Sequence, residues 1–239
     1  MGMNIGLLIA GGVGRRMEMN VPKQFLQVEG KPVIMYTLES FQRCADIDAI
    51  AVVCLKGWED ELKKWAFEFG ITKLKYITAG GATGMESLRN GMNLLRENCS
   101  EDDVIIIHDA VRPLVSCDII KRNIEAVEKY GTAITSLPAT EAILYSEEHN
   151  ENGAESSNVI DRNNIIKTQT PQSLRLSKFV WAHNEAIKRG ITDTVATCTL
   201  LIELGEKVHI VWGDEMNFKI TTPEHIELLK AYLKVRDCK

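Results

Sequence analysis

The fold is decided by the stretch Ile5-Gly6-Leu7-Leu8-Ile9-Ala10-Gly11-Gly12-Val13-Gly14-Arg15-Arg16-Met17. Its apolar part, residues 5–9, has the length and composition of a buried strand. Three glycines then leave the backbone bare, so its N–H groups can approach an anion closely. Two arginines follow, and Lys23 comes after Pro22. A bare loop with fixed positive charge favours a nucleotide triphosphate as ligand, although a glycine-rich turn with surface arginines has the same pattern.

Apolar runs alternate with helical patterns along the rest of the chain. The expected strands are residues 5–9, 49–55, 74–77, 104–107, 132–137 and 208–211. The expected helices are residues 33–43, 58–69, 85–97, 117–130, 176–189, 195–204 and 223–235. Continuous apolar strands such as Val104-Ile105-Ile106-Ile107 are typical of a sheet covered on both faces. The alternation predicts an α/β fold with a Rossmann-like, doubly wound, mostly parallel sheet, in which ligands bind at the carboxyl ends of the strands.

One segment, residues 141–164, breaks this alternation. It holds two short β-like pieces around the polar run Ser146-Glu147-Glu148-His149-Asn150-Glu151-Asn152-Gly153. This pattern predicts a β-hairpin arm that projects from the domain, with its base included at about residues 139–167. A long surface loop is the alternative, and loops of this length in compact domains are often functional.

Length and composition indicate one globular domain, residues 1–239, with 45% hydrophobic and 26% charged residues. The net charge of −5 disfavours a nucleic-acid partner. The first apolar run is too short for a signal peptide or a membrane span, so we expect a cytoplasmic protein without a membrane partner. The six cysteines form no CxxC pair, which predicts free thiols, mostly buried, and no zinc site.

The glycine loop fits neither of two better-known nucleotide-binding templates. A dinucleotide fingerprint needs a third glycine where Met17 stands, and a Walker loop needs Gly-Lys-Ser/Thr. Together with Pro22-Lys23-Gln24, the loop instead resembles the signature of nucleotidyltransferases. More narrowly, it resembles the family of 2-C-methyl-D-erythritol 4-phosphate and ribitol 5-phosphate cytidylyltransferases. Six separated motifs in the family's order, from about residue 5 to residue 233, carry this resemblance over nearly the whole chain.

A second glycine-rich stretch, Thr78-Ala79-Gly80-Gly81-Ala82-Thr83-Gly84-Met85-Glu86-Ser87, follows the third expected strand. Its small residues let a planar base approach the backbone, and Ser87 offers a hydrogen bond; a turn with a helix cap is the alternative. In the resembled family the matching stretch binds cytosine. Relatives often carry an acidic residue at Ala82 and an arginine at Gly84. The resemblance implies a CTP site formed by Ala10, Gly11, Gly12, Gly14, Arg16, Lys23, Gly80, Gly81, Ala82, Ser87 and Asp109.

The stretch His108-Asp109-Ala110-Val111-Arg112-Pro113 ends the most apolar expected strand. An aspartate at this point is placed to hold Mg²⁺ against a triphosphate, because Mg²⁺ prefers one or two carboxylates plus phosphate oxygens. The planar guanidinium of Arg112 can donate two hydrogen bonds to a second phosphate; a local ion pair at the strand end is the alternative. The resemblance implies Asp109 as the metal ligand and Arg112 as a contact of the second substrate's phosphate. We interpret His108 as structural.

The remaining candidates follow the arm. Without the resemblance, Arg162 and Lys219 are interpreted as surface cations. Thr192 is either a substrate contact or a helix N-cap. The resemblance implies that the arm clasps a second subunit in a homodimer and that Arg162 crosses to the partner's acceptor phosphate. Ala142 stands where relatives often have threonine, so one hydroxyl contact is missing. The implied catalytic residues are Arg16, Lys23, Arg162 and Lys219, and the implied acceptor-binding residues are Ala110, Arg112, Arg162, Thr170, Thr192 and Lys219.

These motifs predict transfer of CMP from CTP to a polyol phosphate with release of pyrophosphate and with Mg²⁺ as cofactor. The acceptor is 2-C-methyl-D-erythritol 4-phosphate or D-ribitol 5-phosphate, which belong to isoprenoid and teichoic acid synthesis. A phosphomonoester is largely ionised near neutral pH, so the reaction requires no general base. The alternatives are another nucleotide or acceptor, a non-catalytic nucleotide-binding homologue and, least favoured, a nucleic-acid module.

Overall fold

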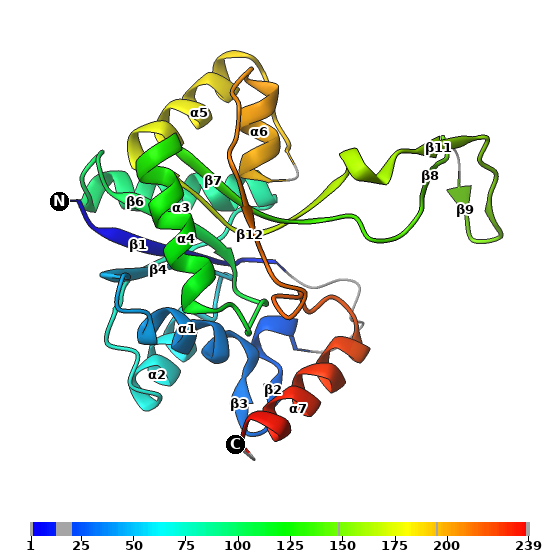
Figure 1. Cartoon of the computed structure of the whole chain (residues 1–239). Coiled ribbons are helices and arrows are strands. Elements are labelled where there is room, and N and C mark those ends of the chain that lie inside the picture. The colour runs from blue at the N-terminus through cyan, green and yellow to red at the C-terminus, as the bar shows by residue number, and fades with distance from the viewer. Residues whose placement is uncertain (1, 13–20, 148, 195, 238–239) are drawn as a thin grey trace.

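A seven-stranded sheet forms the centre of the molecule in a computed structural model that describes residues 2–12, 21–147, 149–194 and 196–237 (Figure 1). Within these residues the strand order is β13-β7-β12-β6-β1-β4-β5. Neighbours pair in parallel except where β12 takes part. The strands are β1 (Asn4–Ala10), β4 (Ala49–Cys54), β5 (Leu74–Ala79), β6 (Val104–Asp109), β7 (Thr132–Pro138), β12 (Ile166–Arg175) and β13 (Ile210–Trp212). The doubly wound, mostly parallel sheet expected from the sequence is confirmed.

The strand β12 is the one member of the sheet that the sequence did not predict. It runs antiparallel between β6 and β7, and its pairing with β7 shifts register between Thr168 and Gln172. Its first part, Ile166-Lys167-Thr168-Gln169-Thr170-Pro171, is polar and contains a proline, which is unusual inside a central strand. Hydrophobic periodicity therefore cannot identify it. The last expected strand, residues 208–211, also lies slightly later in the chain, as β13.

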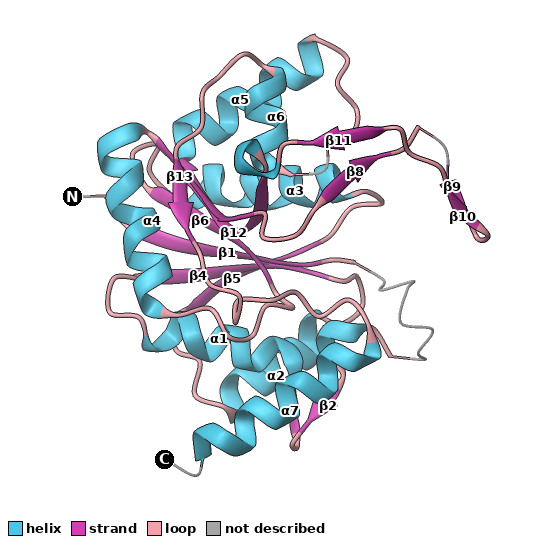
Figure 2. Ribbon diagram, turned by 45° about the vertical axis from the view of Figure 1, so that its right-hand side comes forward, coloured by secondary structure: helices cyan, strands magenta, loops and turns pink. Residues whose placement is uncertain are grey.

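Helices cover both faces of the sheet (Figure 2). Side chains of a strand point alternately to opposite faces, so each apolar strand contributes to two cores. Leu8, Ile50 and Ile106 pack in one core, and Leu7, Ala51 and Ile105 pack in the other. The first core is covered by α1 (Val33–Arg43), α2 (Glu59–Glu68) and α4 (Cys117–Tyr130). The second is covered by α3 (Gly84–Asn98), α5 (Leu176–Lys188) and α6 (Thr197–Glu203).

Capping side chains account for several helix ends. The Thr83 hydroxyl accepts a hydrogen bond from the Glu86 N–H at 3.1 Å and starts α3. Ser116 starts α4 in the same way, and Gly131, with φ of 80°, ends it. All seven expected helices are present, with ends within two residues of the prediction. For the helix expected at residues 195–204, the first residue, Val195, lies outside the described part.

The last helix, α7 (Pro223–Asp237), packs beside the sheet on a third small core. Leu229 and Leu233 of this helix contact the group that contains Val28 and Ile220. A short hairpin of β2 (Gln27–Val28) and β3 (Lys31–Pro32), which the sequence did not predict, belongs to the same region. This core joins the segment that carries Lys219 to the segment that follows Lys23.

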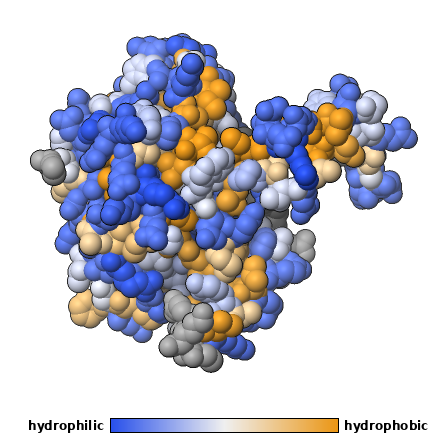
Figure 3. Space-filling model, viewed as in Figure 1, coloured by the Kyte–Doolittle hydropathy of each residue, from blue (hydrophilic) through white to orange (hydrophobic). Residues whose placement is uncertain are grey.

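The segment at residues 141–164 forms the predicted hairpin arm. In it β8 (Ile143–Tyr145) pairs with β11 (Asn158–Ile160), and β9 (His149–Asn150) pairs with β10 (Gly153–Ala154). Figure 1 shows the arm projecting away from the helices and the sheet. The register partners Leu144 and Val159 are 65% and 78% exposed. They contribute to the apolar surface that Figure 3 shows on the arm.

Three further observations concern the chain as a whole. Among the described residues, no helix is both long and apolar enough to cross a bilayer. The five cysteines in this part are free; Cys44, Cys54 and Cys198 are buried as expected, whereas Cys117 is exposed at the start of α4. The same residues contain no group of three or more His, Cys, Asp or Glu side chains that could hold a metal ion. A metal held by one carboxylate and a substrate is a different kind of site.

Candidate active site

Two adjoining cavities open at the carboxyl ends of the parallel strands. One, of about 550 Å³, lies between the loop after β1 and the loop after β5. The other, of about 320 Å³, lies against β6 and β12. Both cavities are lined by Ile9, Gly84, Asp109 and Lys219. The arrangement provides space for two ligands that meet at a shared wall.

The two glycine-rich loops approach each other at the larger cavity. A Cβ atom added to Gly80 would lie 3.0 Å from the Cα atom of Gly11, so the approach depends on glycine. Gln24 is buried beside them, and its Nε2 donates to the carbonyls of Ala10 at 2.7 Å and Gly12 at 2.8 Å. Gln24 thus holds the start of the glycine loop against β1. The sequence analysis gave it no role, although it belongs to the Pro-Lys-Gln motif.

The loop after β5 is held by its own side chains. The Gly81 N–H donates to Ser87 Oγ at 3.1 Å, and the Ala82 N–H donates to Glu86 Oε2 at 2.7 Å. The Ser87 hydroxyl in turn donates to the Thr83 carbonyl at 2.9 Å. These bonds shape the loop and occupy two backbone donors that the sequence offered to a base. Contacts of this loop with cytosine stay a prediction.

Asp109 lies between two cations at the wall that both cavities share. Its Oδ1 accepts a hydrogen bond from Lys219 Nζ at 2.8 Å, and its Oδ2 accepts one from Arg112 Nε at 2.9 Å. Burial raises the pKa of the Asp109 carboxyl, but the charges of Lys219 and Arg112 outweigh burial and hold that pKa well below its usual range. Asp109 is therefore ionised at neutral pH. The sequence left open whether Asp109 and Arg112 form a local ion pair or a ligand site. They form the ion pair, and this pair lies in the cavity wall.

Behind Asp109, polar side chains connect β6 to β12. The Asp109 N–H donates to Thr170 Oγ1 at 3.0 Å, and this hydroxyl lies 3.0 Å from His108 Nδ1. His108 Nε2 lies 3.2 Å from the Arg112 carbonyl. His108 is fully buried, and burial lowers its pKa to about 4. Its position out of contact with solvent agrees with the structural interpretation.

Asn217 connects this group to the segment that carries Lys219. Its carbonyl accepts a hydrogen bond from Arg112 Nη1 at 2.7 Å, and its Nδ2 donates to the Thr170 carbonyl at 2.8 Å. Asn217 is fully buried. The sequence gives no signal for this role, because the partners of Asn217 lie 47 and 105 positions away in the chain.

Two of the predicted phosphate-binding cations, Lys23 and Arg112, line the paired cavities. Lys23 lines the larger cavity, and its Nζ donates to the Ile220 carbonyl at 3.0 Å, next to Lys219. Arg112 lines the smaller cavity. Gly14 and Arg16, which the sequence also assigned to CTP, lie outside the described residues.

Three predicted acceptor-binding residues do not line either cavity in the described part of the chain. Ala110 is fully buried, with its N–H bonded to the Ile9 carbonyl and its own carbonyl bonded to Thr37. Thr192 is exposed. Arg162 is exposed at the base of the arm and donates to the Thr140 carbonyl at 2.9 Å. A substrate contact by any of the three stays a prediction.

The smaller cavity also contains residues that the sequence analysis did not select. Gln169, Thr194 and Thr197 line it together with Thr170. Gln169 and Thr194 are near neighbours of the predicted residues Thr170 and Thr192, whereas Thr197 is in α6 and belongs to no motif. Only the folding of α6 against β12 places it there.

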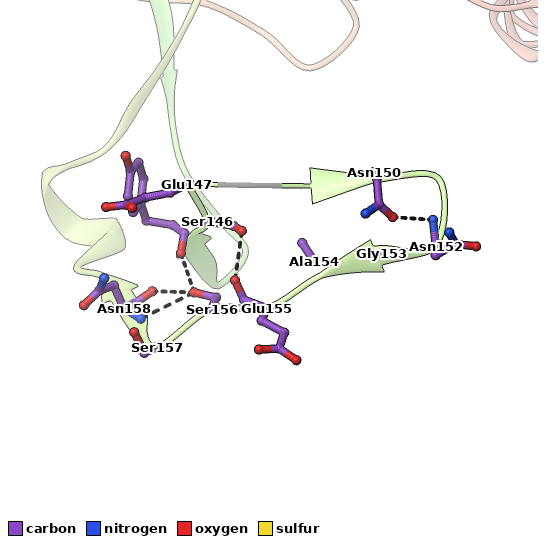
Figure 4. A pocket seen from close by; sticks show the side chains of 11 residues that line it. Ser146, Glu147, Asn150, Asn152, Gly153, Ala154, Glu155, Ser156, Ser157 and Asn158 are labelled. Carbon is purple, nitrogen blue, oxygen red and sulfur yellow. Dashed lines mark hydrogen bonds between the residues drawn. The ribbon is translucent and has the colours of Figure 1, made fainter.

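A further cavity, of about 690 Å³, lies on the arm (Figure 4). The loop segments around it are linked by local hydrogen bonds, such as Ser146 Oγ to the Glu155 carbonyl at 2.8 Å and the Asn152 N–H to Asn150 Oδ1 at 2.8 Å. None of the predicted site residues lines it. Its size therefore does not make it the reaction site, because the charged and glycine-rich groups gather at the sheet edge instead.

The fold and the paired cavities define the class of the protein. A doubly wound sheet that presents a glycine-rich loop and fixed cations at one edge is typical of α/β proteins that bind nucleotides and other phosphates. Residues 5–235 match the family described as IspD, 2-C-methyl-D-erythritol 4-phosphate cytidylyltransferase. The chain belongs to this family.

Individual relatives are similar over almost their full length. A ribitol-5-phosphate cytidylyltransferase of Vibrio parahaemolyticus is 41% identical, with 98% of each chain covered. A 2-C-methyl-D-erythritol 4-phosphate cytidylyltransferase of Geotalea uraniireducens is 35% identical, with 95% of each covered. The crystal structure of 4-diphosphocytidyl-2C-methyl-D-erythritol synthase from Anaerococcus prevotii superimposes with a TM-score of 0.79 at 25% identity, covering 98% of this chain and 97% of that one. These similarities confirm the predicted family and fold. They also confirm the predicted activity, cytidylyl transfer from CTP to a polyol phosphate.

Proposed function

We propose that this cytidylyltransferase uses D-ribitol 5-phosphate, forming CDP-ribitol and pyrophosphate. The observation that carries this proposal is the higher sequence identity to the ribitol-5-phosphate relative, 41% against 35% for the methylerythritol relative. 2-C-Methyl-D-erythritol 4-phosphate is the second candidate, favoured by the description of the family and by the name of the Anaerococcus prevotii enzyme with the similar crystal structure.

The lining of the smaller cavity supports a hydroxyl-rich acceptor. Gln169, Thr170, Thr194 and Thr197 supply amide and hydroxyl groups, while Arg112 supplies positive charge for the phosphate. The same cavity is also lined by Ile9, Leu88 and Ile107, so its lining fits the methyl branch of the methylerythritol acceptor as well as the hydroxyl groups of ribitol 5-phosphate. The choice between the two acceptors rests on the sequence identities.

The reaction is attack by an acceptor phosphate oxygen on the α-phosphorus of CTP. An O–P bond forms, and the bond to the pyrophosphate leaving group breaks. The acceptor phosphate is already ionised, so proton removal is unnecessary. The barrier is electrostatic, because one anion must approach another. Preorganised cations at the shared wall lower this barrier most effectively when they face the charge that develops in the transition state.

Each predicted catalytic cation has a place in this proposal. Lys23 neutralises the triphosphate in the larger cavity, and Arg16 is assigned the same task from the sequence. Lys219, at the wall common to both cavities, faces the reacting phosphates from either side. Arg162 holds the acceptor phosphate in line from the partner subunit, an orientational contribution.

Asp109 fits the role of a Mg²⁺ ligand. Its carboxylate is ionised and borders the nucleotide cavity, and each of its oxygens accepts one hydrogen bond from the described residues, of about two that such an oxygen can take. Mg²⁺ requires only one or two protein carboxylates when phosphate oxygens and water complete its shell. When bound, the ion would neutralise phosphate charge beside Lys219.

The arm supports a homodimer formed by this single nucleotidyltransferase domain. Leu144 and Val159 form one apolar face of the hairpin and are largely exposed in one chain, where their burial against a second copy would be favourable. The segment at about residues 139–167 is thus the proposed dimerisation arm. A CTP-dependent reaction also agrees with the cytoplasmic location expected from the sequence.

The acceptor is tested by pyrophosphate release with CTP and Mg²⁺, with ribitol 5-phosphate and 2-C-methyl-D-erythritol 4-phosphate offered in parallel. We expect a higher kcat/KM for ribitol 5-phosphate. A preference for the methylerythritol acceptor would contradict the proposal and place the chain with the second candidate. A parallel titration with UTP controls for the choice of nucleotide.

A further inference from the structure

The contacts between Thr170, His108 and Arg112 have a direction that follows from elementary chemistry. The Arg112 carbonyl can only accept, so His108 Nε2, 3.2 Å away, carries the ring proton. In the neutral ring Nδ1 is then an acceptor, and the Thr170 hydroxyl, 3.0 Å away, donates to it. The Asp109 N–H donates to the same hydroxyl oxygen at 3.0 Å. The bonds therefore run from Asp109 through Thr170 and His108 to Arg112.

This direction limits what Thr170 can offer to a substrate. A threonine hydroxyl has one proton and two lone pairs. The proton is used on His108, and one lone pair is used on the Asp109 N–H. Thr170 can therefore accept one further hydrogen bond but cannot donate to a phosphate. Its main effect is on Asp109.

Both ends of the path belong to one short turn. The Arg112 N–H donates to the Asp109 carbonyl at 3.1 Å, and Arg112 Nε donates to the Asp109 carboxylate at 2.9 Å. The path through Thr170 and His108 closes a ring behind this turn and ties it to β12. His108 borders the smaller cavity but has no exposed surface, and its ring nitrogens are engaged by the Arg112 carbonyl and the Thr170 hydroxyl. We therefore assign it an effect on the turn.

We propose that His108 is a positioning residue for cytidylyl transfer: together with Thr170 it holds the Asp109–Arg112 turn so that the Asp109 carboxylate and the Arg112 guanidinium face the substrates. The proposal rests on the cytidylyl transfer activity but not on which polyol phosphate is used. Misplaced charges weaken transition-state stabilisation more than they weaken binding of CTP by the glycine loops. Loss of the hydrogen bonds between Thr170, His108 and Arg112 should therefore lower kcat more than it raises the KM for CTP.

The test compares kcat and KM for His108→Gln, Thr170→Val and the double variant, with the better acceptor. Glutamine keeps a donor near the Nε2 position but removes the acceptor of the Thr170 hydroxyl. We expect each single variant to lower kcat about tenfold, the effect of roughly one buried hydrogen bond, with little change in the KM for CTP. The double variant should be no worse than Thr170→Val, because both changes break the same path. His108→Asn places an amide oxygen near the Nδ1 position but loses the donor to the Arg112 carbonyl, so it should restore part of the kcat that His108→Gln loses.

Two results would overturn the proposal: an unchanged kcat in His108→Gln, or additive losses in the double variant, which would mean that Thr170 acts on the acceptor independently of His108. His183→Gln is the matched control, because His183 is also buried but lies on α5, and it should leave kcat unchanged.

A ¹⁵N NMR spectrum of the histidines tests the hydrogen bonds of His108 without measuring turnover, because it reports the tautomer of the ring. The proposal requires that His108 is protonated on Nε2 and unprotonated on Nδ1. The opposite tautomer would overturn the proposal. Inactivity of the wild-type chain with both acceptors, combined with the expected tautomer, would instead count against both candidate acceptors and not against the positioning role of His108.

Discussion

At the scale of single residues, the site is an arrangement of charge around one carboxylate. Asp109 accepts hydrogen bonds from Lys219 and Arg112. It thus holds Lys219 at the wall of both cavities and Arg112 at the wall of the smaller one. Without Asp109, the two cations would repel each other, and the proposed Mg²⁺ would lose its protein ligand. Residues that look like surface charges in the sequence thus form one electrostatic unit.

The first prediction concerns this carboxylate. Asp109→Asn keeps the shape of the side chain but removes its charge, so we expect kcat to fall on the order of 100-fold, as for the loss of one preorganised electrostatic group. The remaining activity should depend less steeply on Mg²⁺ concentration. Pyrophosphate release measured over a range of Mg²⁺ concentrations tests both effects. Glu206→Gln, which removes an ion pair with Lys178 away from the cavities, is the control. A normal kcat in Asp109→Asn would remove Asp109 from the site.

The second prediction concerns His183, a buried residue outside the site. Burial, together with the charge of Arg89, lowers the pKa of His183 from 6.5 to about 4, and neither ring nitrogen has a hydrogen-bond partner among the described residues. Between these two pH values the unfolded chain binds a proton at this position that the folded chain does not bind. The free energy of unfolding therefore decreases as pH falls from about 6.5 toward 4, by up to about 3 kcal/mol from this group.

Replacing this histidine should remove that part of the pH dependence. In urea unfolding at pH 7 and pH 4.5, His183→Leu should lose less stability on acidification than the wild-type chain. Equal losses in both proteins would show that His183 does not carry the effect.

At the scale of elements, the nucleotide cavity is formed by two loops that only glycine allows to meet. Gly11 and Gly80 bring the loops after β1 and β5 together, and Gln24 fixes the first loop from behind. The capping bonds of Thr83 and Glu86 fix the second at the start of α3. The strands and helices thus supply fixed ends, and short polar contacts set the shape between them.

The third prediction tests the support of the glycine loop. Gln24→Leu retains a side chain of similar size but removes both hydrogen bonds to the Ala10 and Gly12 carbonyls. We expect the KM for CTP to rise about tenfold, because the loop then has to be ordered by the ligand. The KM for the acceptor should change much less. Isothermal titration with CTP and steady-state kinetics measure these effects. Gln42→Leu, at the far end of α1, is the matched control, and an equal effect of both variants would contradict the assignment.

At the scale of the whole molecule, the arm explains why some predicted residues lie apart from the cavities. Arg162 is exposed at the base of the arm, far along the chain from the glycine loops, and Leu144 and Val159 are exposed further out. These features agree with the proposed dimer, in which each arm completes the site of the other subunit.

The fourth prediction is that Arg162 acts across the dimer. Arg162→Ala and Lys219→Ala should each abolish most activity. When the two variants are co-expressed, about half of the dimers are mixed, and each mixed dimer contains one site with both residues intact. Activity should then return to about one quarter of wild type. If Arg162 acts within its own chain, the mixture stays inactive. Leu144→Asp, which places a charge on the arm, should shift the sedimentation of the chain toward the monomer and lower activity with it.

The sequence by itself determined the periodic elements. Continuous apolar runs predict β1, β4 and β6, and the helices from α1 to α7 carry amphipathic patterns with proline, serine or glycine at several of their ends. Each of these signals is local, because the period of the side chains and the capping residues lie within one element. The family motifs around Gly11, Lys23, Asp109 and Lys219 are local in the same sense, so the activity class was predictable.

Only the tertiary structure decided how those motifs act together. It placed the polar strand β12 in the middle of the sheet and thereby brought Thr170 against Asp109 and His108. It paired Lys219 with Asp109 across 110 positions of the chain. No periodicity encodes such contacts, because they depend on which segments the sheet order sets side by side. The residues that chemistry needs were visible in the sequence, whereas their hydrogen-bond partners became visible only once the chain was folded.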